Sequence, residues 1–351
     1  MTFELTIAIP TYNRPDEVFK TVTNLITQLN TFVNNTEVQI VVCDNSSEIN
    51  WKLKKFNNYP SFKYIHNGVN LGQGKNVNKL FIESDGIYVW VLADDDSISS
   101  HAISTICEEI KSRKFKLNEI AFVTFYTGDK KSSNLWINQP ELERLTSSNT
   151  FLNTSWPHPI FISNNVLDRE KTIRLINQYN LDVLINDTYQ NSVLSFMQIC
   201  SSKHVWVIPQ TLVWDSHRDK FYQVSQGFRV KVFDLMKLRS TLAKCTQNKL
   251  FLKQLNKTVI SSSVVWGFVF TQLSRQLKQQ IIYTKNMKIK ELLFRYRFLL
   301  LVFIVMRYKF IWELFYFFLK LFKPAVAINI RNESQNYLKQ SKFNFIHQTY
   351  D

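Results

Sequence analysis

Three consecutive aspartates, Asp94, Asp95 and Asp96, directly follow an apolar stretch of the chain. Like charges this close together repel one another unless they share a cation. Carboxylate oxygens favour the hard cations Mg²⁺ and Mn²⁺, which usually keep some waters and complete their coordination with substrate phosphates. The pattern therefore indicates metal-assisted chemistry on a phosphate-containing substrate. A solvated loop start or a helix cap would explain the same residues without a metal.

The elements that must position these aspartates alternate between strand and helix. Short apolar runs predict parallel strands at 5–10, 38–44, 62–66 and 88–97, the last of which runs into the aspartates. Apolar residues at helical spacing predict two intervening helices, one carrying Val18, Val22, Leu25 and Leu29 and one carrying Val77, Leu80 and Phe81 and ended by Gly86. This alternation is typical of an open α/β sheet, which binds ligands beyond the carboxyl ends of its strands.

The pattern loosens after residue 100. Strands are predicted at 120–126 and 205–215, helices near 166–180 and 187–199, and an aromatic segment at 156–163. The four cysteines are far apart with no C-x-x-C pair, which argues against a zinc module and a disulfide framework. This cysteine usage fits a reducing compartment. The opening residues predict a first strand rather than a signal peptide, and a cytoplasmic location is expected.

Four ordered motifs, each at the end of a predicted strand, carry a family resemblance. They are I9-P-T-Y-N-R14, D44-N-S-S47, N70-L-G-Q-G-K-N76 and D94-D-D96. This set resembles the nucleotide-sugar half of the inverting family 2 glycosyltransferases of GT-A fold, strongly over residues 1–100 and weakly over 101–217. The resemblance implies a Rossmann-like, mostly parallel sheet flanked by helices, a nucleotide diphosphate sugar as donor, and Mn²⁺ or Mg²⁺ as cofactor.

The resemblance also implies roles for individual residues. Asp44 would accept a hydrogen bond from the uracil N3 of a UDP donor, and Asp96, with Asp94 and His217, would hold the metal. Lys75 stands where many relatives have arginine, and the first place of the family's D-x-D-D pattern is Ala93, so either Asp94 with Asp96 or Asp95 with Asp96 forms the working pair. The nucleotide pocket would be lined by Pro10, Thr11, Tyr12, Asn13, Arg14, Asp44, Asn70, Gly72, Lys75, Asn76, Asp94 and Asp95.

Transfer with inversion requires a base that takes the proton of the acceptor hydroxyl. The matching segment contains Asn186-Asp187 in place of the family's E-D pair, so Asp187 is the candidate base and Asp182 the alternative. An N-cap role explains Asp187 equally well. Trp156 and His158 are candidates for the acceptor wall, although aromatic residues there also suit a core.

Charge is distributed unevenly along the chain, whose net charge is +15. Residues 218–351 carry 24 Lys and Arg against 6 Asp and Glu, whereas residues 1–217 carry a net charge of −3. Within 288–323, Glu291, Arg295, Lys309, Glu313 and Lys320 form one polar stripe on a helix that is otherwise apolar. We therefore expect a catalytic domain at 1–217, divided into 1–100 and 101–217, and a helical, basic, aromatic region at 218–351.

This asymmetry favours peripheral contact with an anionic membrane at the inner face of the cell membrane, and no nucleic acid is expected. The acceptor would then be a glycan or a lipid-linked saccharide of cell-surface polysaccharide synthesis, such as capsule or lipopolysaccharide. The same helix packing on the enzyme's own core is the alternative. Two other functions stay open: a catalytically weakened nucleotide-binding relative, and a membrane or nucleic-acid adaptor that uses the basic half.

Overall fold

The structure is a computed structural model of the 351-residue chain. It describes residues 3–31, 37–112, 120–129, 145–154, 161–181, 189–215, 235–244 and 246–257. Tertiary contacts divide the chain into two compact units, residues 1–218 with 237–254 and residues 219–236 with 255–351. The described residues lie almost wholly in the first unit. The predicted boundary at 217/218 falls outside them.

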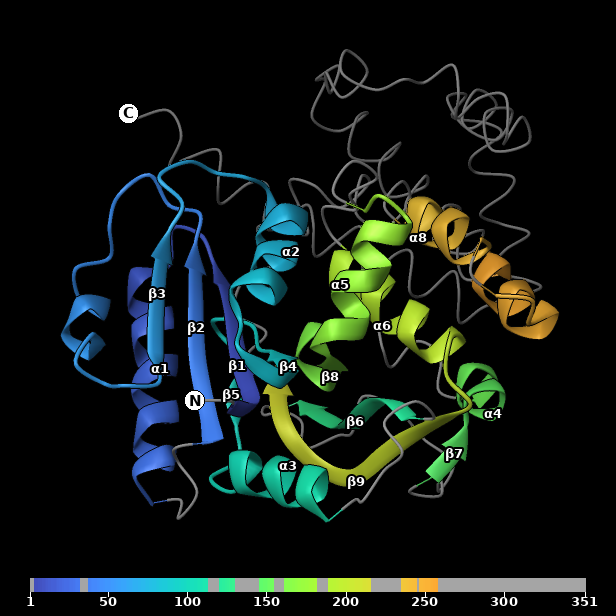
Figure 1. Ribbon diagram of the computed structural model, residues 1–351, viewed down its shortest axis with the longest axis horizontal. Coiled ribbons are helices and arrows are strands. Elements are labelled where there is room, and N and C mark those ends of the chain that lie inside the picture. Colours follow the sequence, from blue (N-terminus) through green and yellow to red (C-terminus); the bar gives the residue numbers. More distant parts are fainter. Residues whose placement is uncertain are drawn as a thin grey trace, which may run out of the picture. The chain divides into compact units, whose positions relative to one another are not determined.

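The described strands form one nine-stranded sheet in the order β3-β2-β1-β4-β8-β6-β9-β5, with β7 pairing beside β9 (Figure 1). The strands are β1 (Phe3–Thr11), β2 (Val38–Asp44), β3 (Phe62–His66), β4 (Gly86–Val91), β5 (Ser97–Ile98), β6 (Ile120–Asp129), β7 (Leu145–Ser147), β8 (Asn165–Asp168) and β9 (His204–Asp215). The helices are α1 (Pro15–Thr31), α2 (Gln73–Glu83), α3 (Ala102–Lys111), α4 (Ser148–Thr154), α5 (Arg169–Gln178), α6 (Gln190–Cys200) and α8 (Leu235–Leu242), with 3₁₀ turns η2 (Leu53–Phe56) and η4 (Ile162–Asn164).

The first four strands are parallel, as the sequence predicts. β1 lies between β2 and β4, and β3 pairs with β2. The register places Thr11 opposite Asp44, the last residues of β1 and β2. Because parallel strands end at the same edge, the polar residues that follow β1, β2 and β4 gather there.

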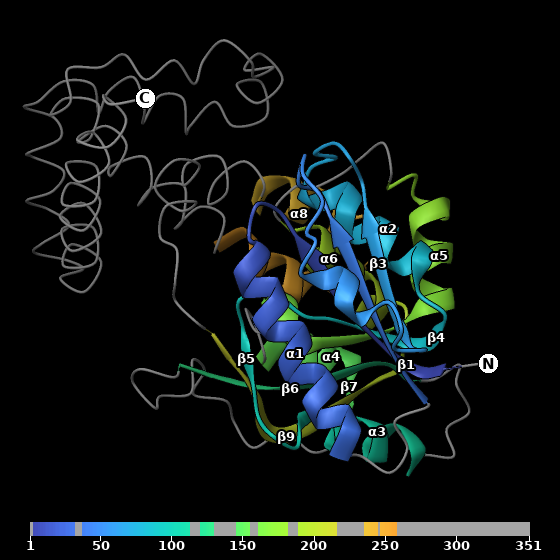
Figure 2. The ribbon, with the colours of Figure 1, turned by 90° about the vertical axis from the view of Figure 1, so that its left-hand side faces the viewer.

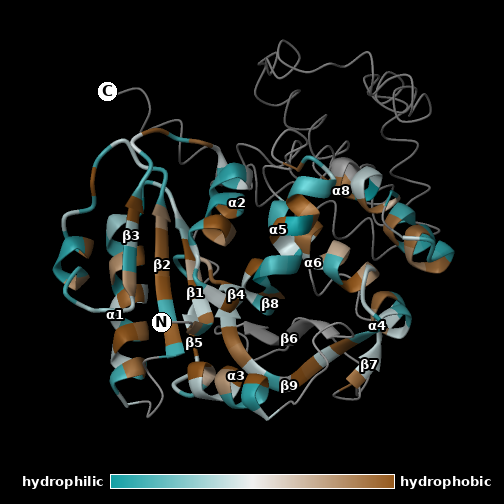
Figure 3. Cartoon of the chain, viewed as in Figure 1, coloured by the Kyte–Doolittle hydropathy of each residue, from teal (hydrophilic) through white to brown (hydrophobic). Residues whose placement is uncertain are grey.

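Helices cover both faces of this parallel half. The odd residues of β1, including Ile7, pack with Val22 of α1 and Ile106 of α3 in one hydrophobic core. The other face contacts α2 and α5. Figure 2 shows α1 on one side of the strands and α2 with α5 on the other, and Figure 3 shows the strands between them as predominantly hydrophobic. Burial on both faces explains why these strands read as continuous apolar runs.

The second half of the sheet is mixed. β8 runs antiparallel to both β4 and β6, β6 and β9 are parallel, and β5 and β7 are antiparallel to β9. α6 is buried along nearly its whole length. β8 pairs with β4, and α6 binds the segment before β8 through Asn191 and the Ile162 carbonyl. The segment 161–165 therefore lies at the end of β4, next to the aspartates.

Two local expectations need correction. The helix expected from residue 166 begins at Arg169, because Asn165–Asp168 forms β8 and the Asp168 side chain caps the helix by accepting from the Lys171 amide at 2.7 Å. Gly86 does not end α2, which stops at Glu83, but opens β4. A Cβ at Gly86 would lie 2.6 Å from the backbone nitrogen of Thr6, so close strand packing accounts for this glycine.

Candidate functional site

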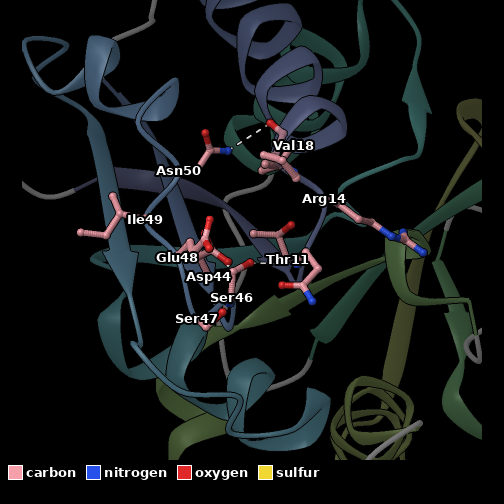
Figure 4. Close-up of a pocket in the computed structure, with 11 residues that line it drawn as sticks. Thr11, Arg14, Val18, Asp44, Ser46, Ser47, Glu48, Ile49 and Asn50 are labelled. Carbon is pink, nitrogen blue, oxygen red and sulfur yellow. Dashed lines mark hydrogen bonds between the residues drawn. The ribbon is translucent and has the colours of Figure 1, made fainter. Parts of the chain in front are cut away.

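A cavity of about 390 Å³ opens at the carboxyl ends of β1 and β2 (Figure 4). Its wall comes from the end of β1, the start of α1 and the loop after β2. The lining residues are Thr11, Asn13, Arg14, Pro15, Val18, Asp44, Ser46, Ser47, Glu48, Ile49 and Asn50. The backbone bends sharply here: Asn13 has a left-handed φ of 54°, which asparagine tolerates, and its amide donates to the Ser46 hydroxyl at 2.8 Å.

Asp44 is the buried carboxylate of this wall, with 1% of its surface exposed. Its Oδ1 accepts from the Ser46 amide and its Oδ2 accepts from the Tyr64 hydroxyl, both at 2.8 Å. Tyr64 in turn accepts from the Asn50 amide at 3.0 Å. Burial raises the pKa of Tyr64, so its hydroxyl keeps the proton that it donates. These bonds fix the Asp44 carboxylate at the cavity, where each oxygen has capacity for a further donor.

Asp94 and Asp95 lie beside the cavity and pair with one arginine. Arg14 Nη1 donates to Asp94 Oδ1 at 3.0 Å and to Asp95 Oδ2 at 2.9 Å. The other oxygen of Asp94 accepts from the Thr11 hydroxyl at 2.6 Å, and its backbone carbonyl accepts from Thr21 of α1 at 2.8 Å. Burial raises the pKa of Asp94 to about 6, against the lowering effect of the Thr11 hydrogen bond and of Arg14.

Asp96 is held from the second half of the sheet. The Ser163 hydroxyl donates to Asp96 Oδ2 at 2.6 Å and accepts from the Ala93 amide at 2.9 Å. The Ser163 carbonyl accepts from Trp90 Nε1 at 2.9 Å. Ser163 and Trp90 are fully buried, so Asp96 is oriented by a rigid part of the core.

The loop before α2 forms a separate polar network behind the cavity. Asn76 is buried and donates to the Cys43 carbonyl at 2.9 Å, while Asn45 Nδ2 donates to the Gly72 carbonyl at 3.2 Å. Gly72 has a left-handed φ of 82°, and its amide donates to Asn70 Oδ1 at 2.9 Å. This network ties the loop to the end of β2.

The structure therefore gathers some of the predicted residues around the cavity and leaves others apart. Thr11, Asn13, Arg14 and Asp44 line it, and Asp94 and Asp95 contact that wall. Tyr12 is 48% exposed, Lys75 is exposed, and neither they nor Pro10, Asn70, Gly72 and Asn76 line the cavity. The predicted residues Trp156, His158, Asp182, Asp187 and His217 lie outside the described residues.

Two residues that orient the carboxylates were not predicted as site residues. Tyr64 lies two residues before the end of β3, on the side of the strand that faces the Asp44 carboxylate. Successive side chains on a strand point to opposite faces, so the predicted strand 62–66 could have indicated which of its residues lie on this side. Ser163 had no signal, since its contact with Asp96 spans 67 residues and depends on how β8 pairs with β4.

The carboxylate oxygens of the aspartates suit a divalent cation whose coordination is completed by the substrate. Among the residues that the structure describes, no three His, Cys, Asp or Glu side chains are arranged to hold a metal ion. Mg²⁺ and Mn²⁺ are commonly held by one or two carboxylates together with waters and substrate phosphates. Asp94 and Asp95, which contact the cavity wall, supply carboxylate oxygens of the kind that such a site uses.

Comparison with known proteins decides the family. Residues 6–174 match the family described as Glycosyl transferase family 2. The chain carries a domain of this family. The match includes most of β1, all of β2, the cavity wall and all three aspartates, so the resemblance noted from the four motifs is confirmed. The protein is a glycosyltransferase. No curated protein matches the chain by sequence.

Solved structures confirm the GT-A fold of this glycosyltransferase. TarS residues 1–349 from S. aureus, in complex with UDP-GlcNAc, aligns with a TM-score of 0.55 at 12% identity, over 76% of this chain and 76% of that one. The mannosyltransferase PcManGT from Pyrobaculum calidifontis, in complex with GDP-Man and Mn²⁺, aligns with a TM-score of 0.53 at 12% identity, over 95% of this chain and 88% of that one. Within the described part of the glycosyltransferase, no helix is both long enough and apolar enough to cross a membrane.

Proposed function

We propose that this glycosyltransferase transfers a sugar from a UDP-sugar to a hydroxyl of a glycan or lipid-linked saccharide, with the help of Mn²⁺ or Mg²⁺. The observation that carries the proposal is the cavity of about 390 Å³ with Asp44 in its wall and Arg14 and the aspartates at its side. Its volume lies within the range of about 300–1,000 Å³ that is usual for small-molecule sites.

Asp44 supports a uracil base. A carboxylate accepts hydrogen bonds and donates none when ionised, so it favours a base that presents an N–H at its edge. Uracil offers N3–H and guanine offers N1–H, whereas N3 of cytosine is an acceptor and would face the carboxylate unfavourably. The family resemblance favours uracil over guanine. Because Tyr64 and the Ser46 amide hold Asp44 in place, the base meets a preorganised acceptor.

The aspartates would hold the divalent cation, with Asp96 as the more direct ligand and Asp94 or Asp95 as the second. A bound cation would neutralise the negative charge that develops on the leaving diphosphate. Thr11 of the cavity wall orients Asp94, and the buried Ser163 orients Asp96, so each carboxylate is held in a fixed position. Neighbouring proteins support this assignment, because PcManGT was solved with Mn²⁺ and GDP-Man.

Asp187 is the proposed general base of an inverting reaction. It would take the proton of the acceptor hydroxyl as the oxygen attacks the anomeric carbon from the face opposite the diphosphate. The support is the family resemblance and the place of Asp187 three residues before α6, whose first residues Gln190 and Asn191 are buried. Asp182 is the alternative base.

The basic residues of 218–351 support a site of action at the inner, anionic face of the cell membrane, where lipid-linked acceptors of cell-surface polysaccharide synthesis are found. Sedimentation of the full chain with vesicles tests this assignment. Binding to vesicles that contain phosphatidylglycerol, lost in high salt and absent with phosphatidylcholine alone, is the expected result. Equal binding to both kinds of vesicle would contradict an electrostatic attachment.

Titration calorimetry with UDP, GDP and CDP, each with and without Mn²⁺, tests the donor site. We expect UDP to bind most tightly and to require Mn²⁺, and we expect Asp96→Ala to abolish the contribution of the metal. Asp85→Ala, which removes an exposed carboxylate outside the cavity, is the matched control. Absence of nucleotide binding in the parent protein would refute the proposed donor site. Release of free sugar from a panel of UDP-sugars then identifies the donor.

A further inference from the structure

Arg14 occupies the position of a cation between two carboxylates. A single nitrogen, Nη1, donates to Asp94 and to Asp95 at 3.0 and 2.9 Å. The Asp94 side chain is 7% exposed and that of Asp95 is 19% exposed, whereas the Arg14 side chain is 33% exposed. The guanidinium therefore reaches the carboxylates from the solvent side of the site.

The backbone that carries Arg14 is fixed, but its side chain is long. Asn13 is anchored to Ser46, and α1 begins directly after Arg14. Thr21 of the same helix binds the Asp94 carbonyl, so helix and aspartate loop stay together. A change of partner at Arg14 can thus occur by rotation of the side chain alone, with Asp94 left in place.

Arg14 also lines the cavity in which the diphosphate would lie. Figure 4 shows its side chain extending away from Asp44 and from the loop that follows β2. A guanidinium can bind two phosphate oxygens at once, as it binds carboxylates. Arg14 therefore has two competing anionic partners: the aspartates and the donor's diphosphate.

We propose that Arg14 is the resident counter-ion of Asp94 and Asp95, and that it exchanges with the divalent cation when the donor binds. Two cations cannot occupy the same carboxylate oxygens without strong repulsion, so binding of the metal releases the guanidinium, which then pairs with the diphosphate. Arg14 in this scheme neutralises the two carboxylates while no metal is bound and competes with the metal for them. The inference rests on the proposed donor and metal site.

The exchange predicts opposite effects of one substitution on two ligands. In Arg14→Gln, the affinity of the nucleotide-free full chain for Mn²⁺ rises by about tenfold or more, because the competing charged hydrogen bonds are gone. The affinity for UDP in saturating Mn²⁺ falls by a similar factor, because the diphosphate loses its partner. If the ion pair only held the carboxylates in place, Arg14→Gln would instead lower the affinity for Mn²⁺, because the carboxylates would become disordered.

Both affinities are measured on the same preparations, Mn²⁺ by the electron paramagnetic resonance signal of the free ion and UDP by calorimetry. Arg174→Gln is the matched control, because it removes an exposed arginine that pairs with Glu170 and leaves the aspartates untouched. It should change neither affinity appreciably. Arg14→Lys keeps the charge without the planar fork and should shift both affinities in the same directions but less, which provides the test if the Gln variant does not fold.

The outcomes separate this inference from the proposed function. If the parent chain binds UDP and Mn²⁺ but Arg14→Gln binds Mn²⁺ no more tightly, the exchange is wrong and the donor site stands. If the parent binds no nucleotide or binds it equally without metal, the proposed metal-dependent donor site fails and the exchange is refuted with it.

Discussion

The buried Asp94 carboxyl should contribute less to the stability of the metal-free enzyme at neutral pH than at mildly acidic pH. The pKa of this carboxyl rises from 3.8 to about 6 on folding, chiefly through burial. Between about pH 4 and pH 6 the folded state therefore holds a proton that the unfolded state has lost, so the free energy of unfolding decreases as pH rises through this window. A shift of about two pKa units corresponds to roughly 3 kcal/mol.

Asp94→Asn isolates this contribution. The variant lacks the titrating carboxyl but keeps its size. The rest of the protein titrates alike in the variant and the parent, so the difference between their unfolding free energies follows the Asp94 carboxyl alone. The unfolding free energy of the variant minus that of the parent should therefore rise by about 2–2.5 kcal/mol between pH 4 and pH 7. Urea unfolding in EDTA, followed by circular dichroism at half-unit pH steps, measures this difference.

A control variant shows whether the effect belongs to Asp94. Asp16→Asn removes a carboxylate whose side chain is 74% exposed and that pairs with Lys52 at the surface. Its difference from the parent should change far less over the same pH range. If the Asp94→Asn difference is as flat as that of the control, then Arg14 and Thr11 compensate the burial of the charge, and the reasoning is refuted.

Four further predictions follow from single contacts. The affinity of the parent for Mn²⁺ should fall about tenfold from pH 7 to pH 5, as Asp94 takes up a proton, measured by titration of free Mn²⁺. Ser163→Ala should weaken Mn²⁺ binding in the presence of UDP by about tenfold, because Asp96 loses the hydrogen bond from Ser163. An unchanged affinity would show that Ser163 does not orient Asp96. Tyr64→Phe should cost about 1–2 kcal/mol of unfolding free energy and weaken UDP binding, since the carboxylate that ends β2 loses a donor; calorimetry and urea unfolding measure the two effects. Gly86→Ala should destabilise the fold by about 1–3 kcal/mol in urea unfolding, because its Cβ would press on the Thr6 backbone 2.6 Å away.

The parallel half of the fold was predictable because its signals are local. β2 and β3 match the predicted strands at 38–44 and 62–66, and the four apolar positions of α1 are all buried. Buried parallel strands produce long apolar runs, and their polar ends mark the edge where a ligand binds. The placement of Thr11 opposite Asp44 follows from parallel pairing once those ends are known.

What the sequence could not predict depends on contacts across long stretches of chain. The four-residue strand β8 is too short to show alternation and leads directly into α5. The pairing of Arg14 with Asp94 joins residues 80 apart, and it depends on side-chain rotamers that no periodicity encodes. The aspartates were predicted to need a cation, and the structure supplies one from within the chain. The roles of Asp187 as general base and of His217 as metal ligand remain predictions.

The segment 161–165 joins the two chemical halves of the enzyme. Ser163 holds Asp96, the proposed metal ligand, and the carbonyl of its neighbour Ile162 accepts from Asn191 Nδ2 at 3.0 Å. Asn191 lies in the first turn of α6, and the proposed base Asp187 precedes that helix by three residues. Metal ligand and base segment are therefore linked through two adjacent residues of one short turn. Because Ser163 and Asn191 are both buried, a shift of α6 would be transmitted through this turn to Asp96.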